Sequence, residues 1–556
     1  MCSLRTSMFV AAVFPSLLAA QPAALRIAPS AIDAVFKDYG PKTPGCALGV
    51  YSNGRILYAK GYGMADLNLG VPISPGTVFD IGSTSKQFAA AAIVLLANDG
   101  KLSLSDDVRK HIPELPDYGT VITIDHMLRH TSGLRDYNGL LFLAGHYFED
   151  YTSDDDALSV ITAQRALNFT PGSKWDYSNS GYFLLSVIVK RVTGQTLAEF
   201  AKTRIFTPLA MPLTHFRTDH TALLPNRAVA YSPGSAPGQF VIDMSNWDQA
   251  GDGAVNTTVL ELAKWDANFY EPTVGGRTLS DRLQERGRLD NGDTLQYARG
   301  LFVDSYRGLR RVQHGGAWAG YRAMLMRFPD QRVSIGLTCN VGDADTMARS
   351  EAVADVILAG RFAPSVGSTA TPGAAGPSAG APLRNATNYA GTYFSAVEQA
   401  VVSIDTLKGV AVLNANGAAL PLALTTNTRL SARAGAVTVD FSDGLQSLTV
   451  LSRGRTAGPY RKVAPFVPST SDRAELAGSY RSPELGTTWS ARLEGDSVRL
   501  AGRAVGSGTL RTILKDVYAF DDAIVTFTRG GSGRIDGFTL SAARMKRIRF
   551  DRLAAP

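Results

Sequence analysis

The chain has 556 residues, of which 45% are hydrophobic and 19% are charged. This length is too great for one ordinary core and this composition is too apolar for a disordered protein, so we expect several globular domains. The formal net charge of +7 permits attraction to anionic surfaces such as cell-wall polymers, but no basic run is interleaved with aromatic residues, so nucleic acid is not an expected partner.

The N-terminal residues are typical of a secretory signal peptide. Arg5 precedes an apolar run from Met8 to about Ala20, and small residues follow. We expect residues 1–20 to be a signal peptide and the protein to be exported, to the periplasm or the extracellular space. The alternative is a disordered or buried N-terminal helix. The run is shorter than the roughly 20 apolar residues of a membrane span, and no later run is long enough, so no transmembrane segment is expected.

Two cysteines, Cys46 and Cys339, lie outside this leader, which itself contains Cys2. Both occur in apolar, strand-like segments. They could form a disulfide in an oxidising compartment or stay buried as thiols, and the sequence leaves both possibilities open. No C-x-x-C pattern indicates a structural metal.

Residues 28–362 are predicted to form one α+β (mixed α/β) domain. Helical patterns at 87–96 and 182–192 lie between strand candidates, which are "CALGVYSNGRILYAKGYG" near the start and "RVQHGG", "YRAMLMRFP" and "VSIGLTCN" near the end. Strands at both ends with helices between them predict one sheet that the returning chain completes. The Ala, Gly, Pro and Ser residues that follow predict a linker over residues 363–385.

Beyond the linker, short alternating runs punctuated by Gly, Asp and Asn predict all-β structure. This half also repeats itself, because "YAGTYFS" at Tyr389 recurs as "LAGSYRS" at Leu476 and "VDFSDG" at Val439 is answered by "VTFTRG" at Val525. Two similar β-domains, over 386–466 and 472–556, would best protect their strand edges if each closed into a small barrel.

A first candidate site lies in "FDIGSTSKQFAAAAIVLL", which begins at Phe79. Ser83 and Lys86 are three residues apart, so on a helix they share a face, and the Lys amine could take the Ser proton if burial lowers its pKa. The helix N-terminus would also favour developing negative charge. The alternatives are a Ser that only caps the helix and a solvated first-turn Lys.

Two further segments carry candidate groups. In "FTPGSKWDYSNSGYFLL", Tyr177 and Asn179 would lie on one side of an extended segment, where Tyr177 could act as a base and Asn179 could bind a substrate amide or carbonyl. In "VQHGGAWAGYRAMLMRF", His314 is followed by Gly315 and Gly316, whose bare backbone would let a substrate align and an amide point at an oxyanion. A packed aromatic with a turn-forming Asn, and a surface His with hairpin glycines, are the alternatives.

Together the three segments resemble the serine β-lactamase and penicillin-binding-protein superfamily, in its class C-like branch. The flanking phrases "MLRHTSGLRDY" and "PGSKWDYSNSGY" extend the resemblance from about Ile32 to Phe362. It implies a β-lactamase/DD-peptidase-like catalytic domain with an antiparallel sheet and a helical region, followed by lipocalin-like barrels. The implied roles are nucleophile for Ser83, proton transfer for Lys86 and Tyr177, substrate binding and orientation for Asn179, His314 and Gly316, and an oxyanion hole from the amides of Ser83 and Ala317.

His314 in the third segment indicates which substrates the protein would prefer. A Lys at position 314 would give a substrate carboxylate a fixed positive charge, whereas His is largely neutral at pH 7, given its ordinary pKa of about 6.5. Loss of a charge-assisted hydrogen bond costs on the order of 1.5–3 kcal/mol. We therefore expect weak β-lactamase activity and a preference for amides, esters or peptides bound by their amino end.

The layout of a catalytic domain with tandem β-domains resembles that of bacterial D-aminopeptidases, so a D-aminopeptidase-like serine hydrolase is the leading prediction, with a small peptide, amide or ester substrate. Carboxylesterase and β-lactamase or D,D-carboxypeptidase activity are alternatives of the same fold, and a non-catalytic protein that binds muropeptides is one of another class. The segment "LKDVYAFDDA" could present Asp516, Asp521 or Asp522 to a substrate ammonium, or be a solvated hairpin. The oligomeric state stays open.

His126 and His130 in "HMLRHTSG" have the i, i+4 spacing of zinc ligands. No Glu follows His126 and no third ligand is evident, so we predict no metal and no other cofactor.

Overall fold

Two strands from distant parts of the chain lie side by side at the centre of one sheet. In the computed structural model, β1 (Cys46–Ser52) pairs antiparallel with β13 (Val333–Cys339) over its whole length. The order of the six-stranded sheet is β10-β11-β12-β13-β1-β2, and its other strands are β2 (Arg55–Tyr62), β10 (Phe302–Tyr306), β11 (Leu309–Trp318) and β12 (Tyr321–Phe328). The predicted sheet, completed by the returning chain, is confirmed.

The structure describes residues 25, 27–362, 386–407, 409–415, 418–432, 437–452, 455–464 and 466–554. The predicted signal peptide (1–20) and the predicted linker (363–385) lie outside the described residues. Within the described ranges, no helix combines the length and the apolar character that crossing a membrane requires.

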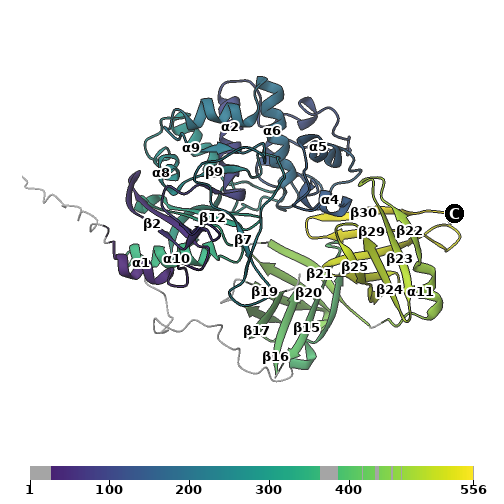
Figure 1. Ribbon diagram of the computed structural model, residues 1–556. Coiled ribbons are helices and arrows are strands. Elements are labelled where there is room, and N and C mark those ends of the chain that lie inside the picture. The colour runs from purple at the N-terminus through teal and green to yellow at the C-terminus, as the bar shows by residue number, and fades with distance from the viewer. Residues whose placement is uncertain are drawn as a thin grey trace, which may run out of the picture.

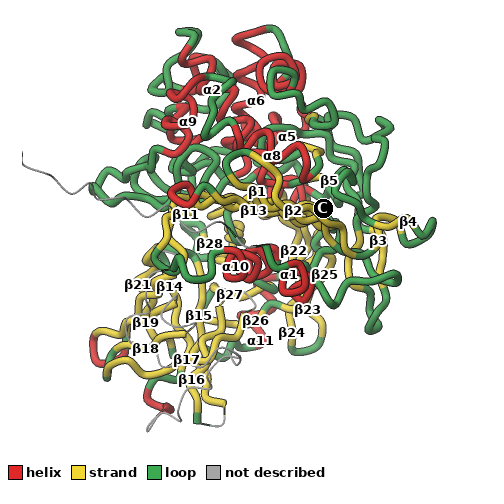
Figure 2. Tube along the Cα trace, turned by 90° about the vertical axis from the view of Figure 1, so that its left-hand side faces the viewer, coloured by secondary structure: helices red, strands yellow, loops and turns green. Residues whose placement is uncertain are grey.

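Helices cover both faces of the sheet, which explains why the two central strands are buried along their whole length. Figure 2 shows α8 (Val259–Ala267) on one side of the yellow sheet layer and α1 (Pro29–Val35) with α10 (Thr346–Ile357) on the other. Strands covered on both faces are nearly continuous apolar runs, as "CALGVYS" and "VSIGLTC" are.

The two cysteines face each other across the central strand pair. Cys46 is opposite Cys339 in the register, and the two form a disulfide. This resolves the choice that the sequence left open.

A helical region lies above the sheet in Figure 1. Its central helix, α2 (Lys86–Asn98), has buried residues on all sides, as expected for "FAAAAIVLL". It packs against α6 (Asn179–Thr193) and α9 (Gly276–Gln284). The two helices predicted at 87–96 and 182–192 are therefore present, and α6 begins three residues earlier than predicted. The remaining helices of the region are α3 (Ile124–Leu128), α4 (Tyr137–Ala144), α5 (Asp154–Thr162) and α7 (Leu197–Ala201).

Short elements connect these layers. The short helical turns are η1 (Gly82–Ser85), η2 (Val108–Lys110), η3 (Lys202–Phe206) and η4 (Pro329–Gln331). The short strands are β3 (Met64–Asp66), β4 (Val71–Pro72), β5 (Phe79–Asp80), β6 (His215–Phe216), β7 (Tyr231–Pro233), β8 (Phe240–Ile242) and β9 (Val255–Thr257).

Two all-β units follow, drawn green and yellow in Figure 1. The first is a closed eight-stranded barrel, with η5 (Ala386–Asn388), β14 (Gly391–Ser395), β15 (Ala400–Leu407), β16 (Val410–Ala415), β17 (Ala418–Thr426), β18 (Arg429–Ala432), β19 (Val437–Ser442), η7 (Asp443–Leu445), β20 (Ser447–Ser452) and β21 (Arg455–Val463).

The second unit is a nine-stranded sheet whose edge strands β25 and β26 are separated in the chain only by Leu510, so the sheet is nearly closed. Its elements are α11 (Thr470–Leu476), β22 (Gly478–Arg481), β23 (Thr488–Glu494), β24 (Ser497–Gly502), β25 (Gly506–Thr509), β26 (Arg511–Leu514), β27 (Val517–Phe520), β28 (Ala523–Arg529), β29 (Ile535–Ala542) and β30 (Met545–Arg552). The predicted fold class is confirmed.

The weak repeat in the sequence corresponds to a shared structural detail. The Tyr393 hydroxyl donates to the carbonyl of Tyr389, and the Tyr480 hydroxyl donates to the carbonyl of Leu476. Both tyrosines lie on the first strand of their unit and bond four residues back. The same hydrogen bond fixes the entry of the chain into each unit.

Candidate active site

Ser83 lies in the turn that leads into α2, between β5 and the helix. It is half-buried among neighbours that are buried, and the backbone of Gly82 is held by a hydrogen bond from its N–H to Asp80 Oδ1. Gly82 has a φ of +47°, a conformation that favours glycine. Neither η1 nor α2 receives a side-chain cap from Ser83, so the capping interpretation is wrong.

Lys86 is the first residue of α2 and its side chain is completely buried, which excludes the solvated alternative. Its Nζ lies 3.1 Å from Ser83 Oγ, 2.8 Å from Asn179 Oδ1 and 2.6 Å from the carbonyl oxygen of Asp252. Burial lowers the pKa of Lys86 to about 7, although the nearby carboxylates of Asp252 and Asp136 act in the opposite direction.

Tyr177 precedes α6 and its hydroxyl is buried. Burial raises the pKa of this phenol well above its ordinary value, and the nearby Ser83 hydroxyl only partly counteracts the rise. No hydrogen bond of regular geometry reaches the Tyr177 hydroxyl from any described residue. Lys86 Nζ lies 4.8 Å from the centre of the Tyr177 ring. A neutral phenol is therefore the stable form.

Asn179 is the first residue of α6, with Ser178 extended before it. Its side-chain oxygen accepts from Lys86, and its backbone N–H donates to Asp136 Oδ2 at 2.9 Å. The side chain therefore positions the amine, and its Nδ2 has no bond to any residue that the structure describes.

Strand β11 contains the third motif, His314-Gly315-Gly316, and runs alongside η1. Its neighbour β10 begins opposite Gln313, so residues 314–318 pair only with β12 in the described sheet. Gly316 packs directly on η1, because a Cβ there would lie 1.9 Å from the carbonyl oxygen of Ile81. A Cβ on Gly82 would lie 2.7 Å from the amide nitrogen of Ala317. The backbone of the exposed Ala317 is therefore held beside Ser83.

His314 belongs to a buried chain of hydrogen bonds. The Tyr297 hydroxyl lies 3.0 Å from His314 Nε2 and 3.1 Å from His130 Nε2. His130 Nδ1 accepts from the N–H of Ser178, so its Nε2 carries the proton and donates to Tyr297. His314 Nδ1 lies 2.6 Å from the Gly315 carbonyl, so it carries the proton and Nε2 accepts. Burial lowers the pKa of His314 to about 3, and Lys86 adds to this, so His314 is neutral at pH 7.

Sequence reasoning missed several of these groups. His130, considered only as a zinc ligand, has φ +58° and lies under the Tyr177 ring, with ring centres 4.1 Å apart. His126 instead accepts from the N–H of Thr123 and caps α3. Tyr297, Asp136 and Asp252 had no local signal, because the fold brings each of them to the site from a separate loop or helix end.

A turn of the last sheet also reaches the site. Figure 1 shows β29 and β30 beside α4, and residues 543–544 form the turn between them. The Arg544 guanidinium lies 3.2 Å from Asp136 Oδ2 and 5.3 Å from the centre of the Tyr177 ring. In the segment "LKDVYAFDDA", which could have presented Asp516, Asp521 or Asp522 to a substrate or formed a solvated hairpin, the Asp516 carboxylate is paired with Arg529 at 2.8 Å.

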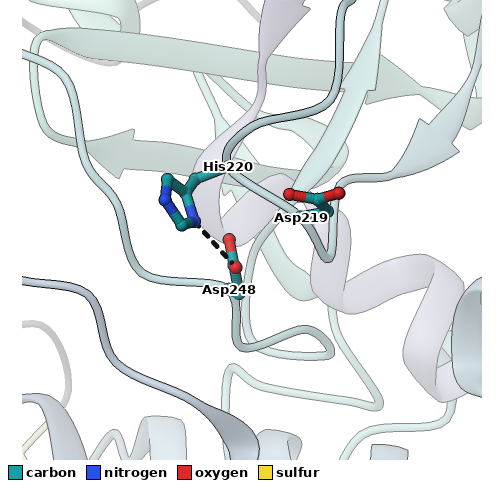
Figure 3. A group of neighbouring side chains, drawn as sticks. All are labelled: Asp219, His220 and Asp248. Atoms are coloured by element: carbon teal, nitrogen blue, oxygen red, sulfur yellow. Dashed lines mark hydrogen bonds and ion pairs between the residues drawn. The ribbon is translucent and has the colours of Figure 1, made fainter.

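One cluster of potential metal ligands occurs among the described residues, and it lies outside this site. Asp219, His220 and Asp248 place ligand atoms within 4.8 Å of one another (Figure 3). Asp248 already lies 3.4 Å from the Arg217 guanidinium and 3.0 Å from His220 Nδ1. Asp219 accepts from Thr221. The two carboxylates of this cluster are therefore already paired with side chains or hydrogen-bond donors of the protein.

The geometry agrees with a known family. A family model described as "Beta-lactamase" matches residues 32–359, which is more than half of the chain. This chain belongs to the beta-lactamase family. The match includes Ser83, Lys86, Tyr177 and His314, so these four side chains all come from the family domain.

Curated relatives resemble this domain more than the whole chain. The chain is 31% identical over 301 residues to "Penicillin-binding protein 4*" of Bacillus subtilis (strain 168), covering 51% of this chain and 65% of the relative. It is 30% identical over 334 residues to a "D-aminopeptidase" of Gluconobacter oxydans (strain 621H), covering 60% of this chain and 61% of the relative. The chain thus spans less than two thirds of the length of these relatives.

Solved structures share the fold over a longer stretch. A structure titled as the octameric penicillin-binding protein homologue from Pyrococcus abyssi has a TM-score of 0.55 at 20% identity, covering 85% of this chain and 96% of that one. The crystal structure of SurE has a TM-score of 0.53 at 21% identity, covering 78% of this chain and 98% of that one. At these identities, the likeness concerns the fold alone.

Proposed function

We propose that the protein is a serine hydrolase that cleaves amide bonds through an acyl-enzyme on Ser83, with D-aminopeptidase-type substrates. The observation that carries the proposal is the buried Lys86 amine, 3.1 Å from Ser83 Oγ. The similarity to relatives named D-aminopeptidase supports the substrate class.

Lys86 acts as the general base. Nζ lies within hydrogen-bond distance of three oxygens, those of Ser83, Asn179 and the Asp252 carbonyl. When the amine is neutral, it donates its two hydrogens to Asn179 Oδ1 and the Asp252 carbonyl, and its lone pair is left to take the proton of the Ser83 hydroxyl. The lowered pKa keeps a large fraction of the amine neutral near pH 7. A buried base next to a serine hydroxyl is the arrangement that nucleophilic catalysis needs.

Acylation then follows from the placement of the backbone. Ser83 Oγ bonds to the substrate carbonyl carbon while its proton passes to Lys86, and the carbonyl oxygen becomes an oxyanion. The N–H groups of Ser83 and Ala317 bind this oxyanion. The C–N bond breaks as the leaving amine takes a proton that Lys86 passes on through the neutral Tyr177 phenol. Water, activated by the same amine, hydrolyses the ester.

The other predicted residues orient the substrate. The free Nδ2 of Asn179 donates to a substrate carbonyl, and the backbone at Gly316 lies against the extended substrate. His314, neutral and held by Tyr297, supplies no positive charge. This supports amide substrates over those that need a cation at the third motif, as the sequence argument proposed.

We also propose that the protein is exported and that its domains divide at residues 28–362, 386–466 and 472–556. The Cys46–Cys339 disulfide supports export, because disulfides persist mainly in oxidising compartments.

A fluorophosphonate probe tests the hydrolase proposal. We expect it to label the wild-type protein and not Ser83→Ala. Ser85→Ala is the control, because the Ser85 hydroxyl is buried and accepts a hydrogen bond from the N–H of Val255. Turnover of D- and L-aminoacyl amides, short-chain esters and a cephalosporin then defines the substrate. Labelling that persists in Ser83→Ala, or faster turnover of the cephalosporin than of any D-aminoacyl amide, would contradict the proposal.

A further inference from the structure

We propose that Arg544 is a specificity-determining residue that selects substrates with a carboxylate on the acyl group. The inference rests on the proposed function and refines its substrate class. It starts from a contrast in charge, since His314 in the third motif is neutral whereas a guanidinium from the last sheet lies over Tyr177.

The turn that carries Arg544 is docked by groups other than its guanidinium. The carbonyl oxygen of Arg544 accepts from Asn168 Nδ2 at 2.7 Å, and the N–H of Lys546 donates to Asn168 Oδ1 at 2.8 Å. Met545 is buried and packs so closely on α4 that a Cβ on Gly139 would lie 2.2 Å from its Sδ. The side chain of Arg544 is therefore not needed to hold the turn in place.

One edge of the Arg544 guanidinium is available to bind a ligand. Nη1 lies 3.2 Å from Asp136 Oδ2, and that carboxylate is 2% exposed and also accepts from the N–H of Asn179. No other hydrogen bond or ion pair of this guanidinium occurs within the part of the chain that the structure describes. The side chain is 38% exposed. Asp136 thus holds one edge of the fork, and the other edge has no hydrogen-bond partner among the described residues.

The Arg544 guanidinium lies close to Tyr177, one of the groups that the proposed mechanism uses. Arg544 lies 5.3 Å from the centre of the Tyr177 ring, and its charge lowers the pKa values of Lys86 and Tyr177. Asp136 connects Arg544 through Asn179 to Lys86 by two hydrogen bonds. A planar guanidinium pairs well with a carboxylate through two parallel hydrogen bonds. A substrate acylated on Ser83 can therefore extend an acidic group toward Arg544.

The test compares two nearly isosteric substrates, the α-(p-nitroanilides) of D-glutamic acid and D-glutamine. We expect the wild-type protein to favour the acidic substrate in kcat/KM by roughly tenfold or more, the size of a charge-assisted hydrogen bond. Arg544→Gln should abolish this preference, because kcat/KM should fall further for the acidic substrate than for the neutral one. Arg534→Gln, at an exposed position between β28 and β29, removes the same charge and should keep the preference.

Equal loss of activity toward both substrates in Arg544→Gln would overturn the inference, because it would mean that Arg544 acts only through Asp136 or the fold. A thermal melt of Arg544→Gln checks that the turn stays docked.

A binding measurement separates this inference from the proposed function. Calorimetry with Ser83→Ala, and with Ser83→Ala/Arg544→Gln, compares the α-amides of D-glutamic acid and D-glutamine without turnover. Tighter binding of the acidic amide that depends on Arg544 supports the inference even if wild type hydrolyses neither anilide, which would refute only the proposed function. Equal binding of the two amides to Ser83→Ala would refute the inference.

Discussion

The guanidinium of Arg135 donates to Glu484 Oε1 at 2.7 Å, and the two side chains are only 1% and 3% exposed. The pair joins the helical region of the family domain to the last β-sheet across 349 residues. Glu484 also accepts from the N–H groups of Arg165 and Arg549. The carboxylate therefore serves as a shared acceptor for both units.

Glu484→Gln should destabilise this contact, because it leaves the Arg135 charge buried without its counter-charge. Breaking a buried pair costs roughly 3–5 kcal/mol. We expect a lower urea midpoint and easier proteolytic release of the last sheet, whereas Glu494→Gln, which removes a mostly exposed carboxylate, should change neither. An unchanged midpoint in Glu484→Gln would mean that the two units do not rely on this pair.

Gly316→Ala should abolish activity, because its Cβ would meet the backbone of Ile81 at 1.9 Å and push β11 away from η1. The displaced Ala317 amide would no longer lie beside Ser83, and loss of one oxyanion donor costs roughly 10²–10³-fold in kcat. Gly315→Ala is the control, since its Cβ would meet the flexible end of Met324 at 3.1 Å and the Ala323 carbonyl oxygen at an ordinary contact distance of 3.6 Å. Steady-state kinetics of both variants, with melting curves, measure the difference; comparable activity in the two would count against the placement of the oxyanion hole.

The pH dependence should reflect the neutral amine. Since burial lowers the pKa of Lys86 to about 7, kcat/KM should rise with pH through about 7 and fall roughly tenfold per unit below it. Burial raises the pKa of the neighbouring Asp252 to about 6, so its titration will make the pH profile depart from that of a single group. A profile that rises only near pH 10 would show that Lys86 keeps the pKa of a solvated lysine.

The same titration has a consequence for stability. The folded protein releases the Lys86 proton near pH 7, whereas the unfolded chain holds it until about 10.4. Between these values the unfolded state binds more protons, so the free energy of unfolding contributed by Lys86 rises with pH in that window. Lys86→Met should remove this slope, as denaturant melts at pH 6 and pH 9 can measure.

Tyr297→Phe should lower activity without removing any reacting group. The change deletes the hydroxyl that joins His130 to His314 and leaves two buried ring nitrogens without their partner, at a cost of about 1–3 kcal/mol. We expect a roughly 5- to 100-fold loss in kcat. Tyr306→Phe, which removes a part-buried bond to Asp355, serves as the control. Full activity in Tyr297→Phe would mean that the hydrogen-bond chain is dispensable for positioning His314.

The sequence predicts the sheet and its helices well because their signals are local. The apolar runs at 46–52 and 333–339 and the helix after Ser83 can be recognised within a few residues. The residue roles proposed for Ser83, Lys86 and Tyr177 came from motif resemblance, and they stay predictions, as do the domain boundaries.

The surroundings of the site could not be predicted from the sequence, because they depend on contacts between residues that are far apart in the chain. Arg544 comes from a turn with no distinguishing pattern, and it reaches Asp136 only because Met545 and Asn168 dock that turn. Asn179 illustrates the same limit. Its pattern indicated a substrate contact, yet burial of Lys86 in front of it gives its oxygen a protein partner.

The bond between Cys46 and Cys339 joins residues that are 293 positions apart and closes a covalent ring around the helical region. A protease that cuts any exposed loop within that ring leaves both fragments attached, so on a denaturing gel the nicked protein keeps the mass of one chain until a thiol reductant is added.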